Sequence, residues 1–199
     1  MMETLVRKGV RRFCAAGIAA AVAGTMMLSA AGTAAAAEKN LTYKGGFPLI
    51  GDQQVAVVVK AEIPATAQAG TPLSVPFSLD VDAGQAAGDG LRLVGATKVS
   101  GTISSKVNVA LTGGQSVSIP VELPIPDTAV PAEGPLKFTA EGKVEFTIPT
   151  GTPAGDATSS VDGAATTHVV TDSSLGEFDV QLALDPPDQD TVLGKTTVG

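Results

Sequence analysis

The chain has 199 residues, 13 of them basic and 20 acidic, and a net charge of −7. It contains one cysteine, one histidine, one tyrosine and no tryptophan. The negative charge argues against nucleic acids and anionic membranes as partners, because both attract basic surfaces. The shortage of cysteine and histidine argues against the usual zinc sites.

The first 37 residues have the order of an export signal. Residues 7–12 hold four basic side chains, residues 13–28 are apolar and uncharged, and Ala34 to Ala37 are the small residues that a signal peptidase reads. We predict cleavage after Ala36 or Ala37, a signal peptide over 1–37 and a secreted single domain over 38–199. A retained membrane anchor is the alternative, but the apolar run is shorter than the ~20 residues of a spanning helix.

Cleavage changes the charge and the thiol content. The signal holds four basic residues and one acidic residue, which leaves 9 basic and 19 acidic residues and a net charge of −10 in residues 38–199. The single cysteine, Cys14, leaves with the signal, so the mature chain has no intramolecular disulfide. A chain of about 160 residues buries roughly 70% of its unfolded surface, so packing alone can hold it together.

The first predicted elements form a hairpin or a strand–corner–strand unit over Leu41–Pro64. Residues 54–63 include four valines, a pattern typical of a central buried strand. Residues 72–81 alternate between apolar and polar side chains, which predicts a half-buried strand, and Pro76 places that strand at an edge or a bulge. Residues 83–96 include Gly84, Gly88 and Gly90, each of which disfavours a helix interior, so we expect one short turn of helix there at most.

The rest of the chain is predicted to be strands and turns. Residues 97–111 and 115–123 pair as a hairpin, with a bulge near Ser104 and Ser105. Residues 124–135 hold four prolines and cross between sheets, and residues 136–148 form a second hairpin around Glu141 and Gly142. We expect a loop over 149–163, strands over 164–171 and 177–184, and a polar tail over 185–199.

Strands at this spacing, joined by Gly and Pro turns, predict an all-β fold. The simplest topology is an immunoglobulin-like antiparallel β-sandwich of about eight strands with at most one short helix, in one domain.

Three short motifs stand out along the chain: Leu41-Thr42-Tyr43 with Phe47–Gly51 and the valine strand to Pro64, then Gly95–Gly101, and finally Leu184–Pro187 with Gln189–Thr191 and Leu193. They resemble a domain family that is common in secreted actinobacterial proteins and is functionally uncharacterised. The resemblance spans the mature chain and implies a secreted β-sandwich, often in tandem copies, with no known activity.

The resemblance also implies that a cysteine pair is missing here. The family typically has one cysteine two residues after the tyrosine and another just before the Leu-Asp-Pro segment. Those places are Gly45 and Leu182 in this chain. If relatives join them by a disulfide, the two positions lie side by side, and packing replaces the bridge.

Catalytic groups are scarce in the sequence. A Ser–His–Asp system needs a histidine, and His168 has Ser159, Ser160 and Asp172 near it in sequence, but no nucleophile-elbow motif is present. His168 is predicted on a surface strand. Paired carboxylates could serve a glycosidase, yet the chain has no tryptophan and one tyrosine on which a sugar could stack.

Calcium is the metal that the residue types fit, since it takes oxygen ligands from loops. Asp80 and Asp82 form one acidic pair, and Asp185, Asp188 and Asp190 form another group. Neither has the spacing of an EF-hand loop, so solvated acidic loops are the competing interpretation.

These observations favour a secreted, non-catalytic extracellular module that binds a protein or a cell-wall or matrix polymer. We expect no cofactor, no nucleic acid and no membrane partner after signal cleavage. The alternative is a secreted hydrolase, or an accessory subunit of one, that uses carboxylates. Sandwich folds host many functions, so the fold does not decide between them.

Overall fold

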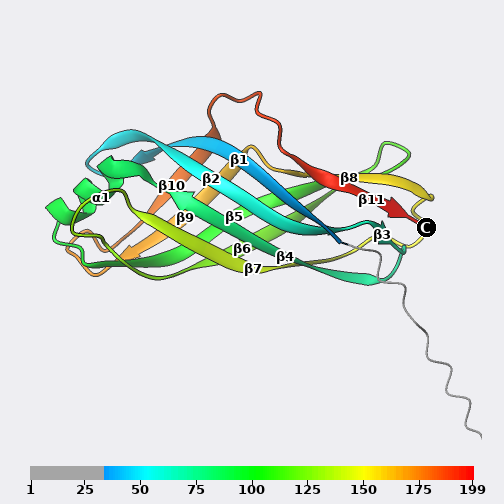
Figure 1. The fold of residues 1–199 in the computed structure, drawn as a ribbon, viewed down its shortest axis with the longest axis horizontal. Coiled ribbons are helices and arrows are strands. Elements are labelled where there is room, and N and C mark those ends of the chain that lie inside the picture. The colour runs from blue at the N-terminus through cyan, green and yellow to red at the C-terminus, as the bar shows by residue number, and fades with distance from the viewer. Residues whose placement is uncertain (1–33) are drawn as a thin grey trace, which may run out of the picture. The chain divides into compact units, whose positions relative to one another are not determined.

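The computed structural model describes residues 34–199, which belong to one compact unit (Figure 1). They form 11 strands and one helix, α1 (Gly84–Leu93). The strands are β1 (Ala34–Phe47), β2 (Gly51–Pro64), β3 (Thr66–Ala67), β4 (Pro72–Asp82), β5 (Lys98–Ala110), β6 (Ser116–Ala129), β7 (Lys137–Thr147), β8 (Gly155–Val161), β9 (Ala164–Thr171), β10 (Glu177–Leu184) and β11 (Val192–Val198). The all-β sandwich is confirmed, with more strands than the eight expected.

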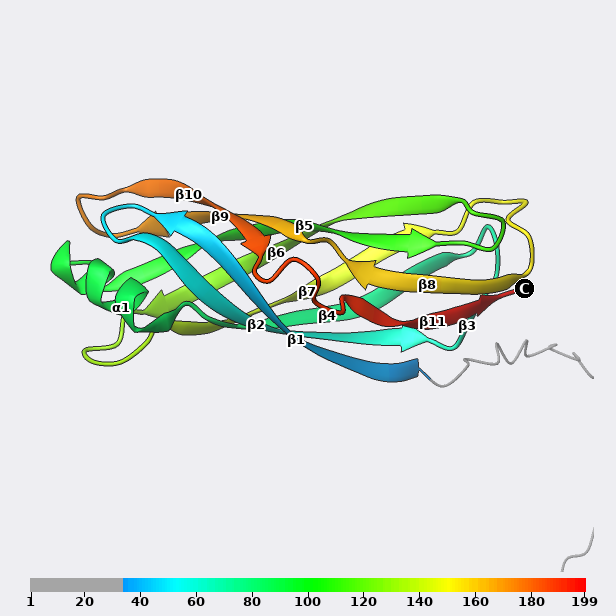
Figure 2. The same ribbon diagram turned by 90° about the horizontal axis from the view of Figure 1, so that it is seen from above.

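The strand order is β3-β11-β8-β5-β9-β10-β1-β2-β4-β7, with β6 on the other side of β5. All pairs are antiparallel except β3 with β11. The sheet folds over on itself, so that β1, β2, β4 and β7 pack against β5, β6, β8 and β11 (Figure 2). Buried side chains from both groups of strands form one hydrophobic cluster.

The expected first hairpin is present. β1 and β2 pair in continuous register from Ala34 opposite Pro64 to Phe47 opposite Gly51. β2 also pairs with β4, so the valine strand is central. Its odd-numbered residues from Val55 to Ile63 are all buried, as the period of two in a strand requires.

Two prolines lie where the ladders tolerate them. β4 has neighbours on both sides, but its pairing with β2 starts only at Phe77, so Pro76 lies where one side has no partner. β6 continues through Pro120 and Pro124 to Ala129, further than expected, because β5 is its one hydrogen-bonded neighbour among the described strands. A proline nitrogen on the unpaired side costs no ladder bond.

The helix is longer than the single turn predicted. α1 has ten residues despite three glycines. Gly88 lies so close to the loop between β6 and β7 that a β-carbon on it would be 2.6 Å from the carbonyl oxygen of Gly134. Tertiary packing therefore outweighs the low helix propensity of glycine. Ala83, Ala87 and Leu91 are buried with Val99 and Leu136 in a second cluster, so α1 closes one end of the sandwich.

Four other predictions were wrong. Residues 137–147 form one strand rather than a hairpin, because the whole segment pairs with β4 and Gly142 lies against the buried Leu123. The expected loop over 149–163 contains β8, and the expected polar tail contains β11. The β5–β6 irregularity lies between Val99 and Gly101 rather than near Ser104.

The predicted signal peptide lies largely outside the described residues. β1 nevertheless begins at Ala34, before the predicted cleavage point. Ala34, Ala35 and Ala36 are exposed, so cleavage after Ala36 or Ala37 would shorten β1 at its exposed end and leave its buried residues in place. The prediction of a signal peptide over 1–37 stays a prediction.

Candidate functional site

An apolar cavity of about 100 Å³ lies between the two layers, toward the end that α1 covers. Its lining comes from both layers, from α1 and from the β1–β2 turn. Aliphatic and aromatic side chains dominate it, among them Phe47, Phe77, Phe138, Phe178, Val59 and Leu182. Protein interiors seldom hold voids much larger than one water molecule, so this space is unusual for a core.

Short side chains of β2 contribute to this space between the layers. β2 provides Val55, Val57 and Val59 to the lining, where five of the seven aromatic residues of the chain also lie. Facing sheets stand about 10 Å apart, and short branched side chains bridge that gap less completely than aromatic ones.

Small residues of α1 leave room on the helix side of the cavity. Ala87, Gly90 and Leu91 of α1 line it, together with Ala83 just before the helix. A β-carbon on Gly90 would lie 3.0 Å from Cγ2 of Ile50, so the helix also packs closely on the β1–β2 turn.

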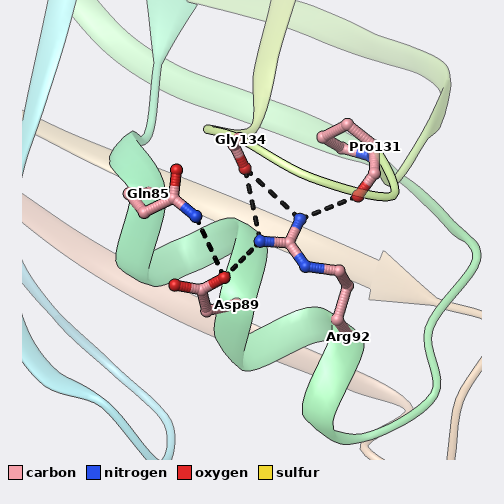
Figure 3. Close-up of polar contacts among 5 residues, drawn as sticks. All are labelled: Gln85, Asp89, Arg92, Pro131 and Gly134. Carbon is pink, nitrogen blue, oxygen red and sulfur yellow. Dashed lines mark hydrogen bonds and ion pairs between the residues drawn. The ribbon is translucent and has the colours of Figure 1, made fainter.

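Arg92 fixes α1 to the loop between β6 and β7 (Figure 3). Its Nη1 donates to the carbonyl oxygens of Pro131 at 2.7 Å and Gly134 at 3.3 Å. Its Nη2 forms an ion pair with Asp89 one turn earlier, and Asp89 also accepts from the side-chain amide of Gln85 at 3.0 Å. The guanidinium thus connects α1, which lies at one end of the cavity, to the loop between β6 and β7.

The last residue of β1 and the β1–β2 turn add four lining residues, Phe47 to Ile50. Leu49 has a φ of 70°, a left-handed conformation that is uncommon for a non-glycine residue. Its side chain is 69% exposed. The turn therefore contributes apolar side chains to the cavity wall and also presents one to solvent.

Tyr43, the one tyrosine of the chain, lines the cavity and is 4% exposed. Its hydroxyl donates to the carbonyl oxygen of Asp162 at 3.2 Å. Burial, with a smaller contribution from the charge of Asp162, raises the pKa of Tyr43 to about 12. The hydroxyl of Tyr43 is therefore a neutral hydrogen-bond donor at physiological pH, and the ring forms part of the cavity wall.

Lys106 is the one charged residue in the lining formed by residues 34–199, but its side chain points to the face of β5 opposite the buried Ile103 and Val107. It belongs to β5, at the point where the neighbour of β5 changes from β9 to β8. Its side chain is exposed, and its carbonyl oxygen accepts from the N–H of Asp162 at 2.9 Å. Tyr43 and Lys106 thus both contact Asp162, at the end of the cavity away from α1.

His168 lies on a surface strand, as predicted. Its Nδ1 is 2.7 Å from Oδ1 of Asp179, and its Nε2 is 3.6 Å from Oε2 of Glu177. The hydrogen bond with Asp179, followed by the charges of both carboxylates, raises the pKa of His168 above its usual value. Its polar partners are therefore on β10 and are not the residues near it in sequence.

The structure does not join Ser159, Ser160 and Asp172 to His168. Ser159 is buried in β8, and Ser160 donates to the carbonyl oxygen of Asn108 at 3.4 Å. Asp172 accepts from the N–H groups of Thr97 at 2.9 Å and Lys98 at 3.1 Å, and from the hydroxyl of Thr97. These bonds, the hydroxyl first, lower the pKa of Asp172 to about 2. Through these hydrogen bonds, Asp172 connects the end of β9 to the start of β5.

The first acidic pair forms bonds to neighbouring strands. Asp80 pairs with Lys60 at 2.6 Å and accepts from Thr139 at 2.7 Å, and both contacts lower its pKa. Asp82 pairs with Lys137 at 2.8 Å and accepts from the N–H of Gly84 at 2.9 Å. The bond to Lys137 is the main cause of its lowered pKa.

The second acidic group lies around the connection between β10 and β11. Asp190 forms an ion pair with Lys39 and accepts from the N–H of Val192 at 3.0 Å, and the pairing with Lys39 lowers its pKa. Over residues 34–199, no group of three or more His, Cys, Asp or Glu side chains is placed to hold a metal ion. The structure thus does not gather Asp185, Asp188 and Asp190 into a metal site.

The cavity was not predicted from the sequence. Its valines and leucines follow the same alternation as fully packed core residues, so no local pattern marks them.

The fold and the cavity define a class of protein: an all-β sandwich domain with an apolar space between its layers. A family model described as a family of unknown function (DUF6801) matches residues 42–194, and the chain belongs to this family. No significant match was found among curated proteins or among solved structures. Within residues 34–199, no helix combines the length and the apolar character needed to cross a membrane.

Proposed function

We propose that the chain is a secreted, non-catalytic module that works outside the cell by binding. The observation that carries the proposal is the apolar cavity of about 100 Å³ between the layers. Ligand sites are usually preformed and mostly apolar with a few polar groups, and the lining of this cavity has that composition. Its volume is below the roughly 300–1,000 Å³ of a typical small-molecule site, so a ligand inside it would be small.

The order of residues 1–37 supports export, with basic, apolar and then small side chains. The resemblance to secreted actinobacterial domains supports the same location. A net charge of −10 after cleavage favours a soluble extracellular protein and disfavours nucleic acid as the partner. A protein or a cell-wall polymer remains the class of macromolecule that such a module would contact.

Location and partner are tested on the protein recovered from the producing cells. We expect an intact mass that corresponds to an N-terminus at Ala37 or Glu38, and enrichment in the medium or on the cell surface. Retention of Met1 in protein outside the cell would contradict the signal peptide. Recovery from the cytoplasm alone would contradict the extracellular function.

The second candidate function is a secreted hydrolase that uses carboxylates. Its support is the contact of His168 with Asp179 and Glu177, an arrangement that could move a proton. A panel of glycosides, esters and peptides distinguishes the two functions. We expect no turnover; turnover that a single change at Asp179 or Glu177 abolishes would establish the hydrolase instead.

A further inference from the structure

We propose that α1 is a lid: it detaches from the end of the sandwich, between Gly84 and Gly95, and thereby opens the apolar cavity to solvent. The proposal concerns access to the site of the binding function above and rests on that function, although its tests need no ligand. It is carried by the way each side of the cavity is closed and by the contacts that hold α1 in place.

The side walls of the cavity are closed by paired strands. A continuous path of hydrogen-bonded neighbours runs from β5 through β9, β10, β1, β2 and β4 to β7. β6 extends this path beyond β5, and its other edge meets β7 by packing, since a β-carbon on Gly142 would lie 2.6 Å from Cδ2 of the fully buried Leu123. Opening a wall would therefore disrupt a ladder or the main hydrophobic cluster. α1 covers one end of the sandwich as a separate element (Figure 2).

α1 is held by little apolar surface. Its buried residues belong to the second cluster, in which three of the six buried members are alanines: Ala83, Ala87 and Ala96. Leu91 is the one large buried side chain of the helix. The N-cap residue is Ala83, which has no side-chain oxygen for the free N–H groups of the first turn. Since the stabilisation from burial is proportional to the apolar area buried, α1 is weakly attached compared with the strands.

The chain is fixed to the sheets on both sides of α1. Before the helix, the N–H of Ala83 donates to the carbonyl oxygen of Leu136 at 2.9 Å. After it, the N–H of Val130 donates to the carbonyl oxygen of Thr97 at 2.8 Å. The segment between these two anchors can therefore leave the surface while the strands keep their places.

Two glycines lie just inside the anchors. Gly84 has a φ of 83° and Gly95 a φ of 74°, in the left-handed region that glycine adopts at little cost. The chain thus changes direction at each end of α1, and between these points Arg92 supplies the hydrogen bonds to another part of the described chain. Loss of those bonds and of the contacts of Leu91 releases α1.

Detachment and melting of α1 are one event. The helix has ten residues, fewer than the roughly 12–15 that an isolated helix needs to persist in water. Its release uncovers Val99 of β5, which is 2% exposed and lines the cavity. Segments that cover binding sites come from the least stable parts of a structure. The lid would let the chain admit a ligand by a route that leaves the strand ladders intact.

Thiol labelling measures this opening. Cys14 is the one cysteine of the sequence, so the full chain with Cys14→Ser is a background without thiols. Ala87→Cys places a thiol on the inner side of α1, and Val99→Cys places one on the strand beneath; both positions are buried and line the cavity. Ser159→Cys is the control, because Ser159 is buried in β8 outside this lining.

We expect iodoacetamide to label Ala87→Cys and Val99→Cys at similar rates, about tenfold or more faster than Ser159→Cys, with each rate taken relative to that of the denatured protein. Low urea should accelerate Ser159→Cys steeply and the other two little, because local opening exposes less surface than global unfolding. One common rate and urea dependence for all three positions overturns the lid. Fast labelling of Ala87→Cys alone would mean that the helix frays without opening the cavity, which also overturns it.

The attachment and the hinge are tested in the two cavity backgrounds. Arg92→Ala should accelerate labelling about fivefold or more, because the closed state loses its charged donor. Gly95→Ala should also accelerate it, because alanine disfavours the φ of the closed state. Gly113→Ala is the matched control: Gly113 has a φ of 91° and equally open surroundings, but it lies beyond the end of β5 that is farther from α1. Equal acceleration by Gly95→Ala and Gly113→Ala overturns the hinge.

Hydrogen exchange on the unaltered chain needs no variant. The amides of residues 88–94 should exchange through an opening that depends little on urea, whereas the ladder amides of β2 should follow global unfolding. Exchange of both sets with the same urea dependence overturns the lid. Export and extracellular location have their own tests on the recovered protein, so the two proposals fail separately.

Discussion

Gly45 of β1 and Leu182 of β10 lie directly opposite each other in antiparallel register, and the leucine fills the space that a side chain on Gly45 would need. A β-carbon on Gly45 would be 2.7 Å from Cδ2 of Leu182 and 2.6 Å from the carbonyl oxygen of Gln181. The N–H of Asp185 donates to the carbonyl oxygen of Thr42 at 3.0 Å, next to the Tyr43–Leu184 pair. By the alternation of an antiparallel ladder, Gly45 and Leu182 form a non-hydrogen-bonded pair.

Gly45→Ala should destabilise the fold by about 1–3 kcal/mol, because the added methyl group overpacks a buried contact with backbone. Gly46→Ala is the matched control. Gly46 is exposed, and the nearest atom to its β-carbon would be 3.6 Å away, on the side chain of Asp52. We expect that change to be neutral or to stabilise by up to about 1 kcal/mol. Urea denaturation of both variants measures the difference, and equal effects would contradict the contact.

The double change Gly45→Cys, Leu182→Cys should form a disulfide. Cα atoms in a non-hydrogen-bonded pair are about 4.5 Å apart, within the ~4.4–6.8 Å that a disulfide accepts. Leu182→Cys removes the leucine, and Gly45 does not have a positive φ, so the contacts with the carbonyl oxygen of Gln181 and with Cγ1 of Val180 are the remaining obstacles. We expect a gain of about 1–3 kcal/mol, below the entropic ceiling of about 5 kcal/mol for so long a loop.

Thiol titration and melts with and without reductant measure the bridge. The reduced double variant is the control, since it has the same side chains without the cross-link. Two persistently free thiols in the folded protein would show that the two strands do not hold this register, and would remove the support for a lost cysteine pair.

Much of the fold could be predicted because alternation along a strand is a local property. β2, β4 and the β5–β6 hairpin have apolar residues at every second position, and the prediction of an all-β sandwich is confirmed. β8 and β11 were missed because residues such as Ala157, Ser159 and Thr196 occupy inward positions. In a sequence, small and hydroxyl-bearing residues are typical of loops. Only their neighbours in the folded structure show that they are buried.

Other features depend on contacts between distant segments. Gly101 has a φ of 150°, and a β-carbon on it would lie 1.9 Å from the carbonyl oxygen of His168. The glycine is therefore fixed by β9, which lies far along the chain. The cavity has the same origin, because it depends on how far apart the layers pack. The pairing of His168 with Asp179 likewise requires the register of β9 with β10.

Arg92→Ala should destabilise the fold by about 1–3 kcal/mol, because two carbonyl oxygens lose a charged donor. The effect should concentrate on α1, with faster amide exchange in residues 84–93. Lys98→Ala removes an exposed pair with Asp127 and should change stability by less than about 1 kcal/mol. Unfolding curves and hydrogen exchange of the two variants measure this. Unchanged exchange in α1 of Arg92→Ala would contradict its role in holding the helix.

Calcium should leave the melting temperature unchanged. The carboxylate of Asp190 already pairs with Lys39 and accepts from the N–H of Val192. Within residues 34–199, no group of three or more His, Cys, Asp or Glu side chains is placed to hold a metal ion. A ligand at 100 times its dissociation constant adds about 2.7 kcal/mol, so true binding would be visible. Thermal melts with and without millimolar calcium test this prediction. A rise of several degrees that disappears in Asp185→Asn, Asp188→Asn, Asp190→Asn would contradict us and restore the calcium site.

His168 should titrate above its ordinary pKa of about 6.5 in the folded protein, because the hydrogen bond with Asp179 and the two carboxylates favour the imidazolium. A group whose folded pKa is raised contributes stability that is fully present below the unfolded pKa. That contribution is lost as the pH rises through the folded pKa. Asp179→Asn should therefore lower the pKa and flatten the decline of stability above pH ~6.5.

The chain has one histidine, so a single imidazole signal in NMR reports the folded pKa without assignment. Asp188→Asn is the control, because it changes the same net charge in the loop after β10 and should leave that signal in place. Denaturation of the unaltered protein at about pH 5.5 and pH 8.5 gives the sign of the linkage, with the lower pH the more stable as far as His168 is concerned. A folded pKa at or below about 6.5 would mean that Asp179 does not hold the imidazolium, and it would also remove the main support for proton transfer at this position.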